Sequence, residues 1–276
     1  MSRNRQVVYL SKLYEFGETV SSFFLIIKSQ IKMVQKVYNQ CDKILISSKG
    51  FEKSICEKGD FKNKIVYFPN WAEDIKDEYP SDFDLTKIKP FDNNENFIIL
   101  FTGNLGGAQN LDAVIEAAKL IKDNKNIKFV FVGDGRRREH LLQLSDEYGL
   151  NATVFFSGRF PLKTMPVFMQ YATVLLFSLK DELCFNLTVP AKVQFYMSQE
   201  KPILAMINGD GADLLREADC GISVAAGDSK CLAESIVKMA AMNKTDLARL
   251  GTNGKSYYLK NFTKEQRIEQ LVKILS

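Results

Sequence analysis

From residue 96 onward, strand-like runs alternate strictly with amphipathic helical stretches, and this alternation constrains the fold more than any other feature. Residues 174–177 are a continuous apolar run and residues 97–102 and 127–132 are mostly apolar, as is typical of parallel strands buried on both faces. A loop and a helical stretch follow each run, and residues 111–122 carry apolar side chains at helical spacing. Strands alternating with helices of this length predict an α/β fold, a Rossmann-like, doubly wound parallel sheet.

Composition narrows the class of protein. The 276 residues are 46% hydrophobic, enough for one large domain or two small ones. A formal charge of +4 is mild, and no basic stripe of a nucleic-acid binder is present. The chain has five cysteines without a Cys-x-x-Cys pair and a single histidine. We therefore expect reduced thiols, a cytoplasmic location, no metal site and no cofactor.

The first 95 residues are less regular. Residues 20–38 read as a helix, and strands at 43–47 and 64–68 flank a short helix at 51–57. This βαβ unit is too small to be a domain by itself. The apolar face of the first helix has two interpretations, a core-facing surface or a membrane-surface contact. Residues 74–96 are rich in charge, proline and asparagine and read as a linker.

Four loops follow predicted strands and should converge on one rim, because ligands of doubly wound sheets bind at the carboxyl ends of strands. Three of the loops are built on glycine: the first holds Gly103, Asn104 and Gly106, the second Gly133 and Gly135, the third Gly158 and Arg159. The fourth spans residues 180–190. The glycines of the first loop have the alternative of serving only a tight turn.

The fourth loop suggests a phosphate beside a polyol. Asp181 and Glu182 can accept hydrogen bonds from sugar hydroxyls, and Pro190 marks the start of a helix whose free N–H groups favour an anion. Lys192 stands in the first turn of that helix, where a cation costs about 0.3–1 kcal/mol unless an anion compensates. Arg138 lies near the start of the helix after Gly135, so it too is a cation at a helix start and a candidate for binding an anion. The alternative for Glu182 is a solvated loop carboxylate.

Several motifs, in this order and spacing, resemble retaining family-4 glycosyltransferases of the GT-B fold. They are YFPNWAE at 67–73, FTGNLG at 101–106, FVGDG at 131–135, VPAKVQFYM at 189–197, KPILAMING at 201–209 and ADCG at 218–221. The branch they resemble most builds bacterial surface polysaccharides and includes N-acetylfucosamine transferases. The resemblance covers roughly residues 41–276.

The resemblance implies metal-independent transfer of a sugar from a nucleotide-diphosphate donor, with a uridine base expected, to a lipid-linked or saccharide acceptor. By position, Glu182 matches the catalytic-site glutamate that contacts donor sugar hydroxyls. Leu187, Thr188 and Val189 match the backbone segment that faces the diphosphate. Together with the loops above, the expected donor-binding set is Gly103, Asn104, Gly106, Gly133, Gly135, Arg138, Gly158, Arg159, Leu187, Thr188, Val189 and Lys192.

The chain departs from the family pattern in three ways. A second glutamate, a ribose ligand in many members, is replaced by Phe195. The usual arginine and lysine after the first donor-domain strand fall on Asn104 and about Gln109, which removes two cations. The first domain is short: we expect residues 1–95 to be a remnant of the acceptor-side domain plus linker, 96–262 the donor domain, and 263–276 a helix crossing back.

Two functions therefore stay open from the sequence. One is a glycosyltransferase, with an association to the inner face of the plasma membrane left open. The other is a non-catalytic donor-binding module, either one half of a split enzyme whose partner chain supplies the missing domain, or a truncated remnant. On its own, such a chain is expected to bind donor without transferring sugar, because transfer needs donor and acceptor held in register.

Overall fold

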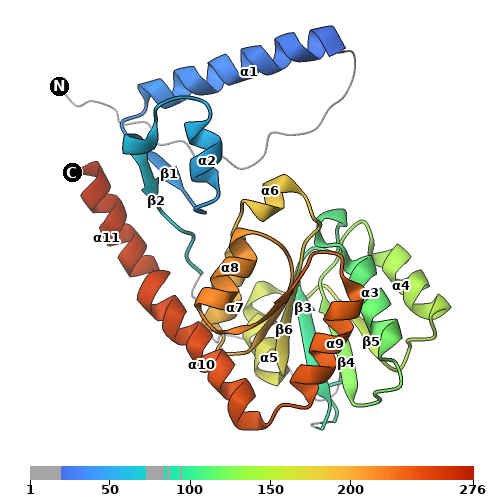
Figure 1. Cartoon of the computed structure of the whole chain (residues 1–276). Helices are drawn as coiled ribbons and strands as arrows, with labels where there is room; N and C mark the ends of the chain where they lie inside the picture. Colours follow the sequence, from blue (N-terminus) through green and yellow to red (C-terminus); the bar gives the residue numbers. More distant parts are fainter. Residues whose placement is uncertain (1–19, 73–83, 86–87, 94) are drawn as a thin grey trace.

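The computed structural model describes residues 20–72, 84–85, 88–93 and 95–276, and contains two parallel sheets (Figure 1). The larger sheet has six strands in the order β5-β4-β3-β6-β7-β8. Its strands are β3 (Phe97–Thr102), β4 (Ile127–Val132), β5 (Val154–Gly158), β6 (Val174–Ser178), β7 (Ile203–Met206) and β8 (Gly221–Val224). Every pairing in this sheet is parallel, which confirms the predicted doubly wound α/β class.

Helices cover both faces of the larger sheet. One face packs against α3 (Leu111–Leu120), α4 (Arg138–Glu147) and α9 (Ser229–Ala240), the other against α5 (Met165–Tyr171), α7 (Ala191–Ser198) and α8 (Asp210–Glu217). Alternation along β3 explains how one strand serves two cores: Ile99 and Phe101 join the first cluster, Ile98 and Leu100 the second. These layers, with α10 (Lys244–Asn261) packed on α7, form what we call the main body.

The order of the strands indicates where a ligand should bind in this sheet. β3 pairs with β4 on one side and with β6 on the other, so the chain order reverses between β3 and β6. The connections after these two strands lead to helices on opposite faces of the sheet, α3 on one and α7 on the other. Doubly wound sheets bind ligands in a crevice at such a point, so we expect one between β3 and β6. The loops after β3 and β6 therefore decide what this sheet can hold.

A second, smaller assembly lies beside the main body. It comprises α1 (Val20–Gln40), β1 (Ile44–Ile46), α2 (Phe51–Cys56), the 3-10 turn η1 (Lys62–Lys64) and β2 (Ile65–Tyr67), and we call it the small unit. Its core includes Tyr38, Ile44, Ile55 and Phe61. Of the first helix, side chains are described only from Ser29 onward, so the apolar run at 23–27 lies outside the described side chains.

The segment predicted as a linker is partly packed. Among its described residues, Leu85 is 1% exposed and Phe91 is 4% exposed, and both belong to the core of the main body. The Phe91 ring meets Phe168 edge-on with a centroid separation of 5.8 Å. Composition predicts exposure here because charged residues dominate, but the two apolar side chains find a face of the sheet to cover.

The last helix connects the main body with the small unit. α11 (Lys264–Leu275) runs alongside both, and Gln270 Nε2 donates to the Tyr67 carbonyl oxygen at 2.8 Å (Figure 1). None of its residues is fully buried, and Ile268, Val272 and Leu275 stay between 43% and 61% exposed. Within the described part of the chain, no helix combines the length and apolarity that a membrane span requires.

Candidate functional site

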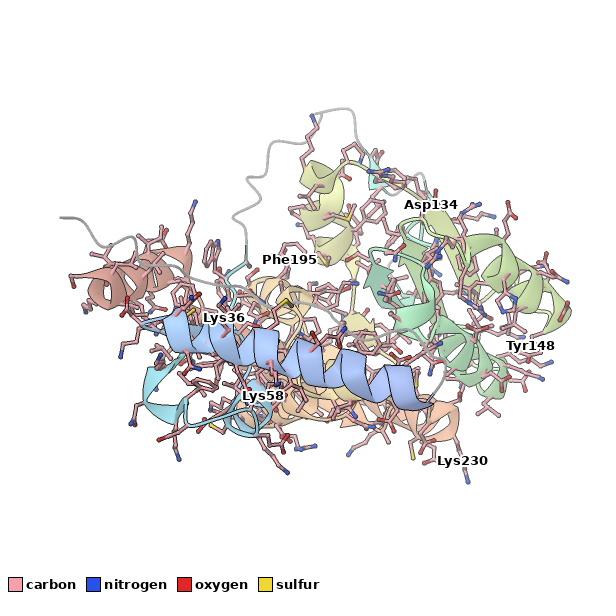
Figure 2. The ribbon with its side chains drawn as sticks, turned by 90° about the horizontal axis from the view of Figure 1, so that it is seen from above. Lys36, Lys58, Asp134, Tyr148, Phe195 and Lys230 are labelled. Carbon is pink, nitrogen blue, oxygen red and sulfur yellow. The ribbon has the colours of Figure 1, made fainter. Side chains whose placement is uncertain are left out.

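Backbone hydrogen bonds join three of the predicted loops into one rim. Gly103 N donates to Val132 O, Gly133 N to Gly158 O, and Leu105 N to Asp134 O, each at 2.8 Å. The ends of β3, β4 and β5 are therefore held together beyond the last strand residues. Seen from above, Asp134 and Tyr148 lie on the opposite side of the molecule from Lys36 and Lys58 of the small unit (Figure 2).

Glycine is required where these loops touch. Gly133 has φ +148°, and a Cβ there would stand 1.8 Å from the Gly103 carbonyl oxygen. At Gly135 a Cβ would stand 2.5 Å from both Leu105 O and Asn104 Oδ1. Asn104, the residue that replaces the family's arginine, therefore fills the gap between two glycine loops and supplies no positive charge.

Helix α7 carries the cation of the site. Lys192 and Tyr196 are one turn apart, so they share a face of the helix. The Tyr196 hydroxyl contacts the end of β3 through Thr102 N at 3.1 Å and Thr102 Oγ1 at 3.2 Å. The Lys192 ammonium lies so near Gly103 that a Cβ on this glycine would be 2.8 Å from Nζ. Tyr196 therefore anchors the helix that aims Lys192 at the crevice.

The ammonium of Lys192 has an unusual environment. It lies 4.3 Å from the ring centroid of Phe101 and 5.9 Å from that of Phe177. Among the described residues, no carboxylate or carbonyl oxygen pairs with it. Burial lowers the pKa of Lys192 from 10.5 to about 8. A partly buried ammonium that lies beside Gly103 and against two aromatic rings is suited to receive an anion.

The anchoring hydrogen bond can be tested directly. We expect Tyr196→Phe to lower the free energy of unfolding by about 1–3 kcal/mol, because the buried N–H of Thr102 would lose its acceptor. Chemical denaturation of both proteins measures this difference. Phe195→Leu, which changes the neighbouring ring without touching Thr102, is the control. An unchanged stability of Tyr196→Phe would show that Tyr196 does not hold α7 in place.

The loop after β6 contains a helical turn that the sequence did not predict. Residues Leu183–Asn186 form α6, and Glu182 occupies its N-cap position with an exposed side chain. Asp181 Oδ1 accepts from Asn186 Nδ2 at 2.8 Å. Hydrogen bonds from Asn186 and Asn208 lower the pKa of Asp181. Asp181 therefore stays ionised and holds the loop, which leaves Glu182 available to a ligand.

The segment predicted to face the diphosphate has its amides occupied in this structure. Leu187 N donates to Leu183 O and Thr188 N to Phe185 O, both at 3.1 Å. Val189 N donates to the hydroxyl of Ser48, in the small unit, at 2.5 Å. Direct phosphate contacts by these amides would need an exchange of partners, so Lys192 is the stronger candidate for the phosphate.

The remaining predicted residues lie at the edge of the rim. Arg138 begins α4 and is partly buried, while Arg159 follows β5 and is exposed. The neighbouring Arg137 has a separate duty, since its Nη2 pairs with Asp112 at 2.5 Å, and His140 Nε2 meets the same oxygen at 2.6 Å. Gly158, with φ +78°, has open space where a side chain would stand.

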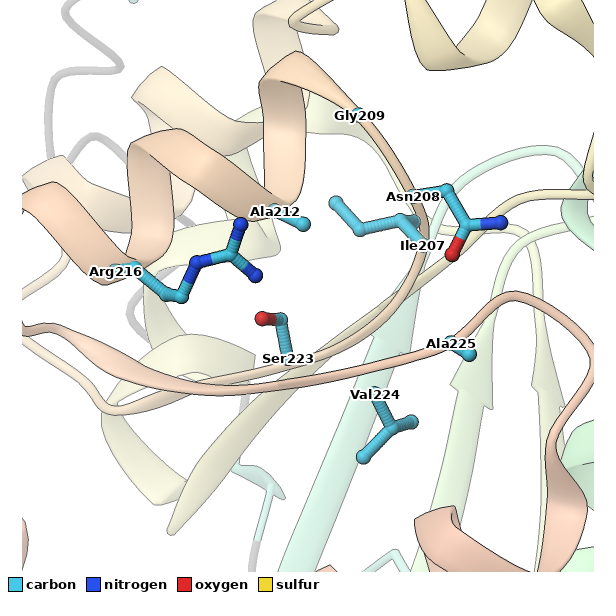
Figure 3. A pocket seen from close by; sticks show the side chains of 8 residues that line it. All are labelled: Ile207, Asn208, Gly209, Ala212, Arg216, Ser223, Val224 and Ala225. Carbon is cyan, nitrogen blue, oxygen red and sulfur yellow. The ribbon is translucent and has the colours of Figure 1, made fainter.

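A distinct pocket of about 320 Å³ lies over the ends of β7 and β8 (Figure 3). It is lined by Ile207, Asn208, Gly209, Ala212, Arg216, Ser223, Val224 and Ala225. Its only charged lining side chain, Arg216, is mostly exposed and pairs with Asp213. None of the predicted donor residues lines it. We place the candidate site at the β3–β6 crevice because the glycine rim is there, together with a lysine that has no anionic partner among the described residues. In the described part of the chain, no three His, Cys, Asp or Glu side chains group as a metal site would require.

Comparison with known families decides the classification. Residues 82–257 match the family described as "Glycosyl transferases group 1". The chain belongs to this family. The matched residues include β3 to β8, the rim and Lys192. The sequence-based assignment to a glycosyltransferase family is confirmed.

The chain is similar to two curated proteins whose names describe glycosyltransferases. The chain is 27% identical over 243 residues to "Probable glycosyltransferase WbjE" of Pseudomonas aeruginosa, an alignment that covers 85% of this chain and 58% of that protein. It is 32% identical over 117 residues to "Putative colanic acid biosynthesis glycosyl transferase WcaI" of Escherichia coli, covering 42% of this chain and 28% of that protein. The chain thus spans little more than half the length of WbjE.

Solved structures share the fold of this family member. HepE of Anabaena, solved in complex with UDP, superposes with a TM-score of 0.74 at 17% identity, over 89% of this chain and 67% of that one. TarM superposes with a TM-score of 0.68 at 15% identity, over 90% of this chain and 46% of that one. These likenesses confirm the expected GT-B architecture, with the main body as its Rossmann-like part.

Proposed function

We propose that the chain binds a nucleotide-diphosphate sugar at the β3–β6 crevice and serves retaining, metal-independent sugar transfer in surface polysaccharide synthesis. The observation that carries the proposal is the Lys192 ammonium, which lies beside Gly103 with no anionic partner among the described residues. A diphosphate would supply the missing negative charge. The acceptor is a lipid-linked or other saccharide, and the protein works in the cytoplasm at the inner face of the plasma membrane.

The arrangement of the crevice supports a division of labour. Lys192 and Gly103 form its phosphate side, because a glycine lets a ligand approach the backbone closely, and Gly133 lets its own loop pack against Gly103. Glu182, exposed at the start of α6, forms its sugar side. Arg159 and Gly158 lie at the β5 end, where the base would extend. The names of WbjE and WcaI and the UDP complex of HepE support the same assignment.

The role of Glu182 gives a specific prediction. We expect Glu182→Ala to weaken binding of a UDP-sugar about 10- to 100-fold and binding of UDP less than about threefold, because a hydrogen bond to a charged group is lost only when the sugar is present. Isothermal calorimetry with both ligands measures the two dissociation constants. Asp181→Asn, which keeps an oxygen to accept from Asn186, is the matched control. Equal losses for the two ligands would remove Glu182 from the sugar site.

Binding across a ligand panel tests the proposed function. Thermal shifts with UDP-, GDP- and dTDP-sugars should show one base preferred, with stabilisation of about 2.7 kcal/mol at a hundredfold excess over the dissociation constant. Chelator and excess magnesium should leave the dissociation constant unchanged. Transfer is then assayed with the preferred donor and membrane-extracted lipid-linked saccharides. A chain that binds none of the donors would contradict the proposal.

Two observations favour a second candidate, a donor-binding part that works with a partner chain. The small unit has only two described strands, and the apolar side chains of α11 at Ile268, Val272 and Leu275 remain exposed. A further α/β segment from another chain would cover such a stripe. Transfer that appears only after an upstream-encoded protein is added would support this candidate, and transfer by the chain alone would exclude it.

A further inference from the structure

The small unit touches the proposed donor site through one turn. Residues 48–50 follow β1 and reach the segment 186–189, which lies immediately before α7. The Ser48 hydroxyl, on a residue that is 0% exposed, accepts from Val189 N at 2.5 Å. Gly50 N donates to Asp210 Oδ2, also at 2.5 Å. Figure 1 shows α6 on the edge of the main body that faces the small unit.

The packing around segment 186–189 leaves it little freedom. On one side, a Cβ at Gly50 would stand 3.1 Å from Leu187 Cα and 2.9 Å from Asp210 Oδ1. On the other side, a Cβ at Gly209 would stand 1.9 Å from Asn186 O. The segment is therefore enclosed between the turn of the small unit and the start of α8, and a substituent on either side would displace it.

Holding this segment also holds the cation. Val189 is followed by Pro190, whose ring fixes its own φ, and then by the first turn of α7 with Lys192. The position of the Val189 amide therefore sets where α7 begins. Tyr196 fixes the same helix one turn later through Thr102. Lys192 lies between these two anchors, one of which comes from the main body and the other from the small unit.

We propose that Ser48 and Asp210 are positioning residues. They hold the segment 186–189 between the small unit and α8 and thereby keep Lys192 at the phosphate position. Ser48 acts through the Val189 amide, and Asp210 acts by fixing the backbone of the turn that carries Ser48. Neither side chain contacts the donor. The inference rests on the proposed function, and it gives the small unit a role in donor binding besides any role with the acceptor.

The experiment compares four proteins: the full chain, Ser48→Ala, Asp210→Ala and Asp210→Asn. The asparagine keeps an oxygen that can accept from Gly50 N and serves as the rescue variant. Amide hydrogen exchange reports on segment 186–193, and calorimetry reports on UDP affinity. We expect Ser48→Ala and Asp210→Ala to raise exchange there and to weaken UDP binding about 3- to 10-fold, while Asp210→Asn stays near the parent.

A double-mutant cycle separates positioning from general destabilisation. If Ser48 acts through Lys192, Ser48→Ala adds no further loss of UDP affinity on a Lys192→Met background. Additive losses would overturn the inference, as would a Ser48→Ala protein that binds UDP like the parent. Failure of the parent chain to bind any nucleoside diphosphate would overturn the proposed function and this inference with it. Binding by the parent with unaffected clamp variants would overturn only the inference.

Discussion

Replacing Lys192 with methionine is expected to weaken UDP binding about 10- to 100-fold while making the protein more stable. The binding loss follows from removal of a charged hydrogen-bond donor to phosphate. The gain in stability, about 1–3 kcal/mol at pH 7, follows because the ligand-free protein no longer has to desolvate an ammonium that has no anionic partner among the described residues. Calorimetry measures the first effect and urea denaturation the second.

The opposed signs distinguish a ligand-binding lysine from a structural one. If the lysine served only packing, its substitution would destabilise the protein and leave UDP binding unchanged. Lys128→Met is the matched control, because Lys128 lies at the amino end of β4 and donates to Ala152 O, far along the strand from the rim. We expect this control to bind UDP like the parent.

Loss of the Lys192 proton at high pH should likewise weaken ligand binding and stabilise the ligand-free protein. Its pKa of about 8 in the folded protein lies below the usual 10.5, so the charge is present below pH 8 and lost above it. Affinity for a UDP-sugar should therefore fall about tenfold between pH 7 and pH 9, and stay nearly flat in Lys192→Met. The free energy of unfolding of the ligand-free parent should rise from about pH 8 toward pH 10.5, where the unfolded chain still binds the proton.

Substituting Gly133 should strongly destabilise the protein. We expect Gly133→Ala to lower the free energy of unfolding by about 3 kcal/mol or more, because the residue has φ +148° and its Cβ would meet Gly103 O at 1.8 Å. The clash is hard to relieve, because Gly103 O is a backbone atom and the new Cβ is fixed directly to the backbone. Donor affinity should fall as well, because the displaced strand end carries Gly103 away from Lys192.

Gly107→Ala is the matched control for this substitution. Gly107 belongs to the same rim, but no atom lies within 4 Å of the position of a Cβ there. The free energy of unfolding of Gly107→Ala should stay within about 0.5 kcal/mol of that of the parent. If the two variants unfolded at the same denaturant concentration, the close approach of the first and second glycine loops would not exist in solution.

The fold of the main body could be predicted because its signals are local. The strands at 97–102 and 127–132 agree with the predicted bounds, and the helix predicted at 111–122 is found at Leu111–Leu120, since apolar runs and helical spacing are read within a few residues. The short helix Leu183–Asn186 could not, because four residues carry no periodicity and the turn is set by what surrounds it. Leu85 and Phe91 were likewise hidden in a segment of polar composition.

In the candidate site, too, the features with a local sequence signal could be predicted and the contacts between distant residues could not. Gly103, Gly133 and Lys192 could be singled out because glycine loops follow strands and a cation stood in the first turn of a helix. The hydrogen bonds that join the small unit to the main body could not be predicted: Ser48 and Val189 are 141 residues apart, and Gly50 and Asp210 are 160 apart. No local pattern encodes such pairs, although the Ser48 turn does follow a strand end, which was the one available signal.

A crystal structure of the chain with UDP tests the central claim most directly. The account predicts the diphosphate in the crevice between β3 and β6, with a phosphate oxygen within about 3.2 Å of Lys192 Nζ and the uracil toward Gly158 and Arg159. Density for the diphosphate beside Arg216, in the pocket over β7 and β8, would contradict the account. An empty crevice at saturating UDP would contradict it equally.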